Sequence, residues 1–143
     1  MLIQGSCHCT NISFELDWSP SPSEIPARAC GCSFCTKHGS VWTAYPQGAL
    51  TVRVKSSELV TQYAFGTCTA QFHVCRQCGV VPVVTSEIEG RVFAVVNVNA
   101  FDNVPTAMLR HSAASFDGEE TTDRLARRAR NWIGDVRFVG GDV

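Results

Sequence analysis

Alternating hydrophobic and polar residues run through most of the chain. Hydrophobic side chains occupy every second position in two segments, at Ile12, Phe14 and Leu16 and again at Leu50, Val52 and Val54. This period of two is typical of half-buried β-strands. Four further strands are predicted over residues 59–65, 69–74, 80–85 and 91–98, with turns at Gly66 and at residues 87–90. We therefore expect a mainly β fold.

One segment near the carboxyl end has a different period. Four hydrophobic residues recur there at helical spacing, at Leu125, Ala129, Trp132 and Ile133. With a candidate cap at Thr121 or Thr122 before them and Gly134 after them, they predict one amphipathic helix. The opposite face carries Arg124, Arg127, Arg128 and Arg130. We interpret this basic face as solvent-exposed, and a binding surface is the alternative.

Composition limits the classes of function. The 143 residues fit a single domain, residues 1–143, and the 12 basic and 13 acidic side chains give a net charge of −1. Such a balance makes nucleic acid an unlikely partner, and the pattern shows neither a signal peptide nor a membrane span. We expect a cytoplasmic protein. Cysteines are kept reduced there, so clustered cysteines are expected to be metal ligands rather than disulfides.

Seven of the eight cysteines fall into three short clusters. Cys75 and Cys78 are separated by two residues and followed by Gly79, a pattern typical of a zinc knuckle. Cys7 and Cys9, two apart on a predicted strand, should point to the same face and supply two further ligands, with His8 facing away. The sequence thus predicts a closed structural zinc site on Cys7, Cys9, Cys75 and Cys78.

The third cluster is one ligand short of a closed site. Cys30, Cys32 and Cys35 can place three sulfurs on one side of a zinc ion and leave the fourth position open, as catalytic zinc sites do. Three thiolates make the complex electron-rich, so a thiol from outside is a more natural fourth ligand than hydroxide. A thiol bound there is deprotonated and nucleophilic at neutral pH. These residues are the predicted catalytic site.

Several alternatives remain open for the cysteines and histidines. His38 can complete a closed Cys3His site with the triplet, and Cys68 can serve as its fourth ligand, although an isolated cysteine is more often a small apolar filler. His73 and His111 are interpreted as ordinary hydrogen-bonded or surface side chains. A redox function of the Cys75 and Cys78 pair is disfavoured because the βαβ setting of such motifs is missing.

Four motifs in order resemble the family of glutathione-dependent formaldehyde-activating enzymes, which includes the centromere protein V group. They are Gly5-Ser-Cys-His-Cys9, Cys30-Gly-Cys-Ser-Phe-Cys35, Phe72-His-Val-Cys-Arg-Gln-Cys-Gly79 and Asn97-Val-Asn-Ala-Phe-Asp102. The resemblance implies tent-like antiparallel sheets built on zinc ribbons, with one structural Zn²⁺ and one labile catalytic Zn²⁺. The tail after Asp102 does not follow the pattern of the formaldehyde-activating members.

The resemblance also implies a reaction. Members of the named type condense formaldehyde with glutathione to S-hydroxymethylglutathione, which is a carbon-sulfur lyase reaction in reverse. We therefore expect a carbon-sulfur lyase that joins a glutathione-like thiol to a small aldehyde. Arg28, Lys37 and Arg110 are candidates for binding an anionic tripeptide. The competing hypothesis is a zinc-stabilised binding module without catalysis, which contacts nucleic acid or a protein partner through the arginine-rich helix.

Overall fold

The computed structural model describes residues 1–140, which form two β-sheets. In the order of its strands, the first sheet contains β1 (Leu2–Ser6), β2 (Ile12–Asp17), β5 (Ala49–Val54) and β11 (Asp135–Gly140). The second sheet contains β10 (Leu109–Ala114), β3 (Ile25–Cys30), β4 (Val41–Thr43), β9 (Arg91–Asn97), β8 (Val83–Ile88), β7 (Gln71–Cys75) and β6 (Val60–Tyr63). The mainly β expectation is confirmed.

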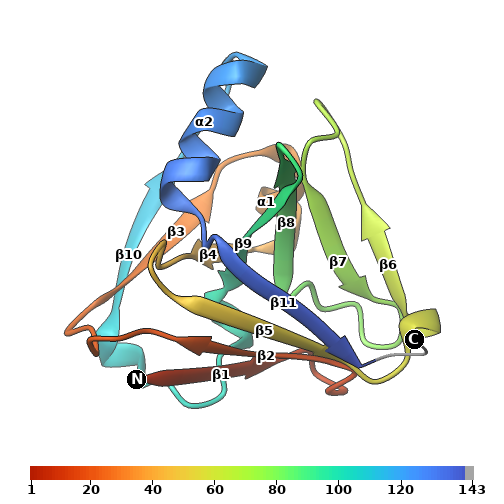
Figure 1. The fold of residues 1–143 in the computed structure, drawn as a ribbon, viewed down its shortest axis with the longest axis vertical. Coiled ribbons are helices and arrows are strands. Elements are labelled where there is room, and N and C mark those ends of the chain that lie inside the picture. Colours follow the sequence, from red (N-terminus) through yellow and green to blue (C-terminus); the bar gives the residue numbers. More distant parts are fainter. Residues whose placement is uncertain (141–143) are drawn as a thin grey trace.

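The two sheets give the molecule a tent-like shape. Figure 1 shows the four-stranded sheet across the bottom and the strands of the seven-stranded sheet rising above it. Most neighbouring strands are antiparallel, as expected, but each sheet has one parallel pair at its edge, β5 with β11 and β3 with β10. Parallel neighbours need a long connection. Both added strands come late in the chain, after the strands they pair with.

The predicted alternation places hydrophobic side chains in the core. Phe14 pairs with Val52, and Leu16 pairs with Leu50, between β2 and β5. All four side chains are at most 1% exposed, because alternate residues of a strand share one face. Burying such aliphatic and aromatic side chains stabilises the fold by about 1.5–3 kcal/mol each. The core therefore lies above the four-stranded sheet and under the seven-stranded one.

The four strands predicted between residues 59 and 98 correspond to β6, β7, β8 and β9, with shifted ends. The largest shift is at β8, which continues to Ile88 and pairs there with Arg91. Only Glu89 and Gly90 remain as the turn, both with positive φ, at 51° and 78°. Two such residues form the tight turn that suits the twist of a hairpin, so the predicted turn over residues 87–90 was too long.

The described residues contain two α-helices, α1 (Ser33–His38) and α2 (Thr121–Asn131). The carboxyl-terminal helix was predicted, but its cap is Glu120 rather than a threonine, and α1 was not predicted. Three short 3₁₀-helices complete the elements: Ser57–Leu59, Val98–Ala100 and Thr106–Met108. Neither α-helix has the length and apolar character needed to cross a bilayer. Beyond α2, the fully buried Ile133 exchanges two backbone hydrogen bonds with Ala94 of β9.

Candidate functional site

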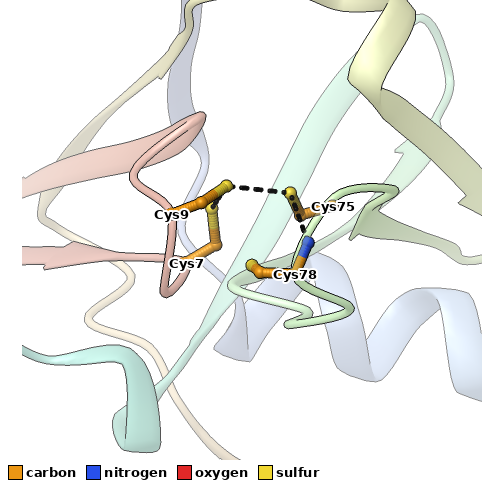
Figure 2. Close-up of side chains that lie close together, drawn as sticks. All are labelled: Cys7, Cys9, Cys75 and Cys78. Atoms are coloured by element: carbon orange, nitrogen blue, oxygen red, sulfur yellow. Dashed lines mark hydrogen bonds between the residues drawn. The ribbon is translucent and has the colours of Figure 1, made fainter.

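The first group of sulfurs, the four-sulfur cluster, contains Cys7, Cys9, Cys75 and Cys78. Figure 2 shows the four side chains converging from two separate turns. All four sulfur atoms lie within 4.8 Å of one another, with 3.8 Å between Cys7 and Cys9 and 3.4 Å between Cys9 and Cys75. Tetrahedral coordination at a Zn–S distance of about 2.3 Å separates sulfurs by about 3.8 Å, so the cluster fits a zinc ion.

The backbone around the four-sulfur cluster differs in one respect from the prediction. Cys7 and Cys9 lie in the turn after β1, not on a strand. The turn is closed by a hydrogen bond from the Cys7 amide to the Ile12 carbonyl and by Thr10, whose φ is 68°. Both sulfurs converge because the turn curls around them. The same-face argument for a strand was therefore wrong, although the convergence of the two sulfurs was anticipated.

Hydrogen bonds prepare these sulfurs for a cation. The Ile12 amide donates to Cys7 Sγ at 3.3 Å, and the Cys78 amide donates to Cys75 Sγ at 3.5 Å. Burial raises the pKa of Cys7 to about 12. Burial also raises the pKa of Cys78, but backbone hydrogen bonds with Cys9 and Val80, together with side-chain hydrogen bonds with Cys75 and Cys7, outweigh it and lower that pKa to about 6. Binding of a cation by the four sulfurs would therefore release the protons of the thiols in this cluster.

The second group, the three-sulfur cluster, contains Cys30, Cys32 and Cys35. Cys30 ends β3, Cys32 caps α1 and Cys35 lies inside α1, so a single strand-to-helix turn holds all three. The three sulfur atoms lie within 4.8 Å of one another. Cys32 Sγ accepts a hydrogen bond from the Cys35 amide at 3.4 Å. The short helix was missed in the sequence, since six residues show too little periodicity to be recognised.

Cys35 is the most enclosed ligand candidate of the three-sulfur cluster. Its side chain is 2% exposed, and its sulfur accepts a hydrogen bond from Trp42 Nε1 at 3.3 Å. The hydrogen bond between Cys35 and Cys30 lowers the pKa of Cys30 to about 5, against the effect of burial. The same hydrogen bond, together with burial, raises the pKa of Cys35. Three convergent sulfurs fit a soft cation such as zinc.

The three-sulfur cluster has no fourth protein ligand within residues 1–140. His38 packs against the Phe34 ring at 4.4 Å, and Cys68 is exposed in the loop before β7, so neither joins the cluster. His73 is buried and hydrogen-bonded to Thr85 at 2.7 Å, as an ordinary core histidine would be. The two clusters therefore differ in their number of sulfurs, with four in one and three in the other, and metal binding by these sulfurs stays a prediction.

A cavity of about 410 Å³ opens onto the three-sulfur cluster. This volume is typical of sites for small molecules. All three cysteines line it, and aromatic side chains, among them Trp42, Phe65 and Phe72, form part of its wall. A molecule in the cavity thus meets sulfur atoms at one side and apolar rings around them.

Arginine side chains of α2 also form part of the wall of the cavity, although the sequence interpretation placed them in solvent. The side chains of Arg124 and Arg127 are 23% and 16% exposed, and Arg128 is 7% exposed. All three line the cavity, and only Arg130 of the predicted basic face is exposed. Their spacing of i, i+3 and i+4 placed them on one helical face. The spacing of the arginines was visible in the sequence. The interpretation failed because it assumed that the apolar face of the helix packs inward, whereas Ala129 of that face is exposed.

Of the three basic residues proposed from the sequence to bind an anionic substrate, the structure places one in the cavity and two outside it. Arg28 of β3 lines the cavity. Arg110 is an exposed partner of Glu24, with 2.8 Å between Nε and Oε1, and Lys37 is exposed on α1. Neither of these two lines the cavity. The positive charge around the cavity therefore comes from Arg28 and the three arginines of α2.

Fold and clusters together define a class of protein: a mainly β tent that holds one four-sulfur and one three-sulfur cluster, with the latter facing a cavity. Residues 2–118 match the family model described as glutathione-dependent formaldehyde-activating enzyme, and the chain belongs to this family. A crystal structure of a Rhodobacter sphaeroides protein is similar, with 31% sequence identity and a TM-score of 0.56. The similarity covers 73% of this chain and 92% of that one. No curated protein matches the chain significantly.

Proposed function

We propose that the chain is a zinc-dependent carbon-sulfur lyase that joins a glutathione-like thiol to a small aldehyde such as formaldehyde. The observation that carries this proposal is the three-sulfur cluster, which lacks a fourth protein ligand among residues 1–140 and faces a cavity of about 410 Å³. An open ligand position that faces a cavity is the arrangement of catalytic zinc sites. Family membership supports glutathione and formaldehyde as the substrates. The four-sulfur cluster would hold the structural zinc.

The residues around the three-sulfur cluster have distinct roles in such a reaction. A zinc ion on Cys30, Cys32 and Cys35 would supply a site at which a substrate thiol loses its proton. The Trp42 Nε1–H group fixes the orientation of Cys35 and would stabilise its negative charge once that thiol loses its proton on metal binding. The rings of Phe65 and Phe72 exclude water and bring the two substrates together.

The bond changes balance without a redox partner. The thiolate sulfur attacks the aldehyde carbon, a carbon-sulfur bond forms, and the carbonyl oxygen takes up the proton that the thiol released. Turnover in reverse breaks that bond and returns thiol and aldehyde. The cavity accelerates either direction through proximity and through the stabilised thiolate.

Replacement of Cys32 by serine tests the proposal. Cys32 caps α1, and serine is a good helix cap, so Cys32→Ser removes a metal ligand while preserving the cap. We expect zinc content to fall from two ions to one per chain and catalysed exchange between ¹³C-formaldehyde and glutathione, measured by NMR, to disappear. Cys68→Ser, at an exposed cysteine outside both clusters, serves as the matched control. Undiminished exchange in Cys32→Ser would rule out this mechanism.

The alternative function, a binding module that uses an exposed arginine face, has lost its main support. Three of the four arginines line the cavity instead of facing solvent. Nucleic-acid binding requires basic side chains that can reach phosphates. Arg130 alone of that group is fully available on α2, so the enzyme remains the function that the site supports best.

A further inference from the structure

Arg128 is a buried cation without an anionic partner among the described residues. Its side chain is 7% exposed, and Nη1 donates hydrogen bonds to Thr69 Oγ1 at 2.9 Å and to Ser86 Oγ at 3.2 Å, both neutral acceptors. Nε is buried and has no hydrogen-bond partner. The guanidinium lies 5.0 Å from the centre of the Trp132 ring. Its hydrogen-bond acceptors are thus all neutral.

The neighbouring Arg127 and Arg124 lie near the carboxylate of Glu119. Arg127 makes a two-pronged contact with Glu119, with 3.1 Å from Nε to Oε2 and 3.0 Å from Nη2 to Oε1. Arg124 donates to the Phe116 carbonyl, and its buried Nε is 3.9 Å from Glu119, too far for a hydrogen bond. One carboxylate therefore faces three guanidinium groups, and Arg124 and Arg128 each keep an unsatisfied donor.

Such an arrangement is costly unless an anion binds to it. Burial of a charge without a counter-charge opposes folding, and like charges nearby add to the cost. Burial, and then the charges of Arg124 and Arg127, lower the pKa of Arg128 to about 10, so the group is still charged at neutral pH. Because Arg128 also lines the cavity, an anionic group of a ligand can reach it there.

The location of this cation links it to the three-sulfur cluster. Arg124, Arg128 and the three cysteines line the same cavity, so one small molecule can contact both. The helix that carries the arginines begins at Thr121, beyond residues 2–118 that match the family model. Arg124 and Arg128 therefore lie outside the residues that match the family model.

We propose that Arg128, assisted by Arg124 one helical turn earlier, binds a carboxylate of the thiol substrate and makes the site selective for thiols that carry one. This inference rests on the proposed function, since it assumes that the sulfur of the same molecule approaches the three-sulfur cluster. The guanidinium group suits the task because its planar donors match the two oxygens of a carboxylate. Arg128 is a specificity-determining residue in this arrangement.

A matched pair of thiols tests the selectivity. N-acetylcysteine and its amide carry the same thiol, but only the former has a carboxylate. We expect zinc-loaded wild-type protein to bind N-acetylcysteine about 10- to 100-fold more tightly than the amide in isothermal titration calorimetry, as is typical of hydrogen bonds to charged groups. Arg128→Gln should remove this preference by weakening only the binding of N-acetylcysteine. Arg130→Gln removes the same charge from an exposed position and should leave the preference intact.

The outcomes separate the two proposals. Equal affinity of the wild-type protein for both thiols would overturn the carboxylate inference and leave the thiol-binding function intact. An equal loss of preference in Arg130→Gln and Arg128→Gln would likewise overturn it. Binding of neither thiol would contradict the proposed function and the inference with it. Should Arg128→Gln fail to fold by circular dichroism, the wild-type comparison and Arg124→Gln, which should lower the preference, decide the question.

Discussion

Replacement of Cys9 by serine should show how far the four-sulfur cluster stabilises the fold. A cation held there joins the turn after β1 to the end of β7, and Cys9 and Cys75 are 66 residues apart in the chain. Cross-linking a loop of this length removes about 4 kcal/mol of chain entropy from the unfolded state, with the relation used for disulfides. Domains of this kind are stable by about 5–15 kcal/mol, so loss of the link should leave the variant marginal.

Two measurements check this expectation. Zinc content should fall from two ions to one per chain in Cys9→Ser, and urea unfolding followed by tryptophan fluorescence should report a loss of about 4 kcal/mol. Removal of zinc from the wild-type protein by a chelator should destabilise it at least as much, since metal binding contributes to the free energy of folding. The exposed Cys68 provides the control, because Cys68→Ser changes a thiol outside both clusters. A Cys9→Ser protein that unfolds at the wild-type urea concentration would refute the reasoning.

Two further substitutions test the support of the second site and the packing of the first sheet. Trp42→Phe removes the hydrogen bond to Cys35 Sγ and should weaken metal binding at the three-sulfur cluster by about 10- to 100-fold in chelator competition; unchanged release of that metal would contradict this role. A Cβ atom at Gly5 would overlap the Phe14 ring, so Gly5→Ala should cost about 1–3 kcal/mol in urea unfolding. Gly31→Ala is the control, because its Cβ would approach no atom closer than 3.4 Å, and an equal loss there would refute the steric argument.

The strands could be predicted from the sequence because alternate residues of a strand point to the same face, so a strand with one buried face shows an alternating sequence. Phe14 and Leu16 recur at a period of two, and both fill the core between the sheets. The parallel neighbours at the sheet edges could not be predicted, since pairing between β5 and β11 depends on contacts between distant segments. The ends of β8 were also missed, because the tight turn uses Glu89, a residue that rarely adopts positive φ.

The cysteine clusters were predictable in membership but not in backbone conformation. A spacing of two residues, as between Cys7 and Cys9, suits both a strand and a tight turn, and Thr10 adopts the left-handed conformation that decides for the turn. For the triplet, Cys32 acts as a helix cap, a role that sequence rules assign to serine, threonine, aspartate and asparagine. The spacing of the cysteines therefore predicted which sulfurs lie together, whereas the strands and loops assigned around them were partly wrong.

The arginines of α2 show where sequence reasoning fails for a physical reason. Rules of amphipathicity assume that the hydrophobic face packs inward, because burying charge is unfavourable. Around the cavity of this protein the cost is reduced, though not removed, by Glu119, by the Phe116 ring 3.6 Å from Arg127, and by the hydroxyl groups that accept hydrogen bonds from Arg128. Such partners come from distant segments and cannot be recognised from the spacing of the arginines.

Charge balance in the proposed reaction explains why arginine side chains line the cavity. Three thiolates around a zinc ion already carry a net charge of −1, and a bound substrate thiolate would raise it to −2 before any carboxylate is counted. In a cavity lined partly by apolar rings, such negative charge is less well stabilised than in bulk water, and nearby cations lower its cost. Arg28, Arg124 and Arg128 line that cavity in a chain whose net charge is only −1, so the positive charge is concentrated where the proposed reaction would need it. None of the four cysteines of the four-sulfur cluster lines the cavity that the α2 arginines line, which agrees with the structural role proposed for that cluster.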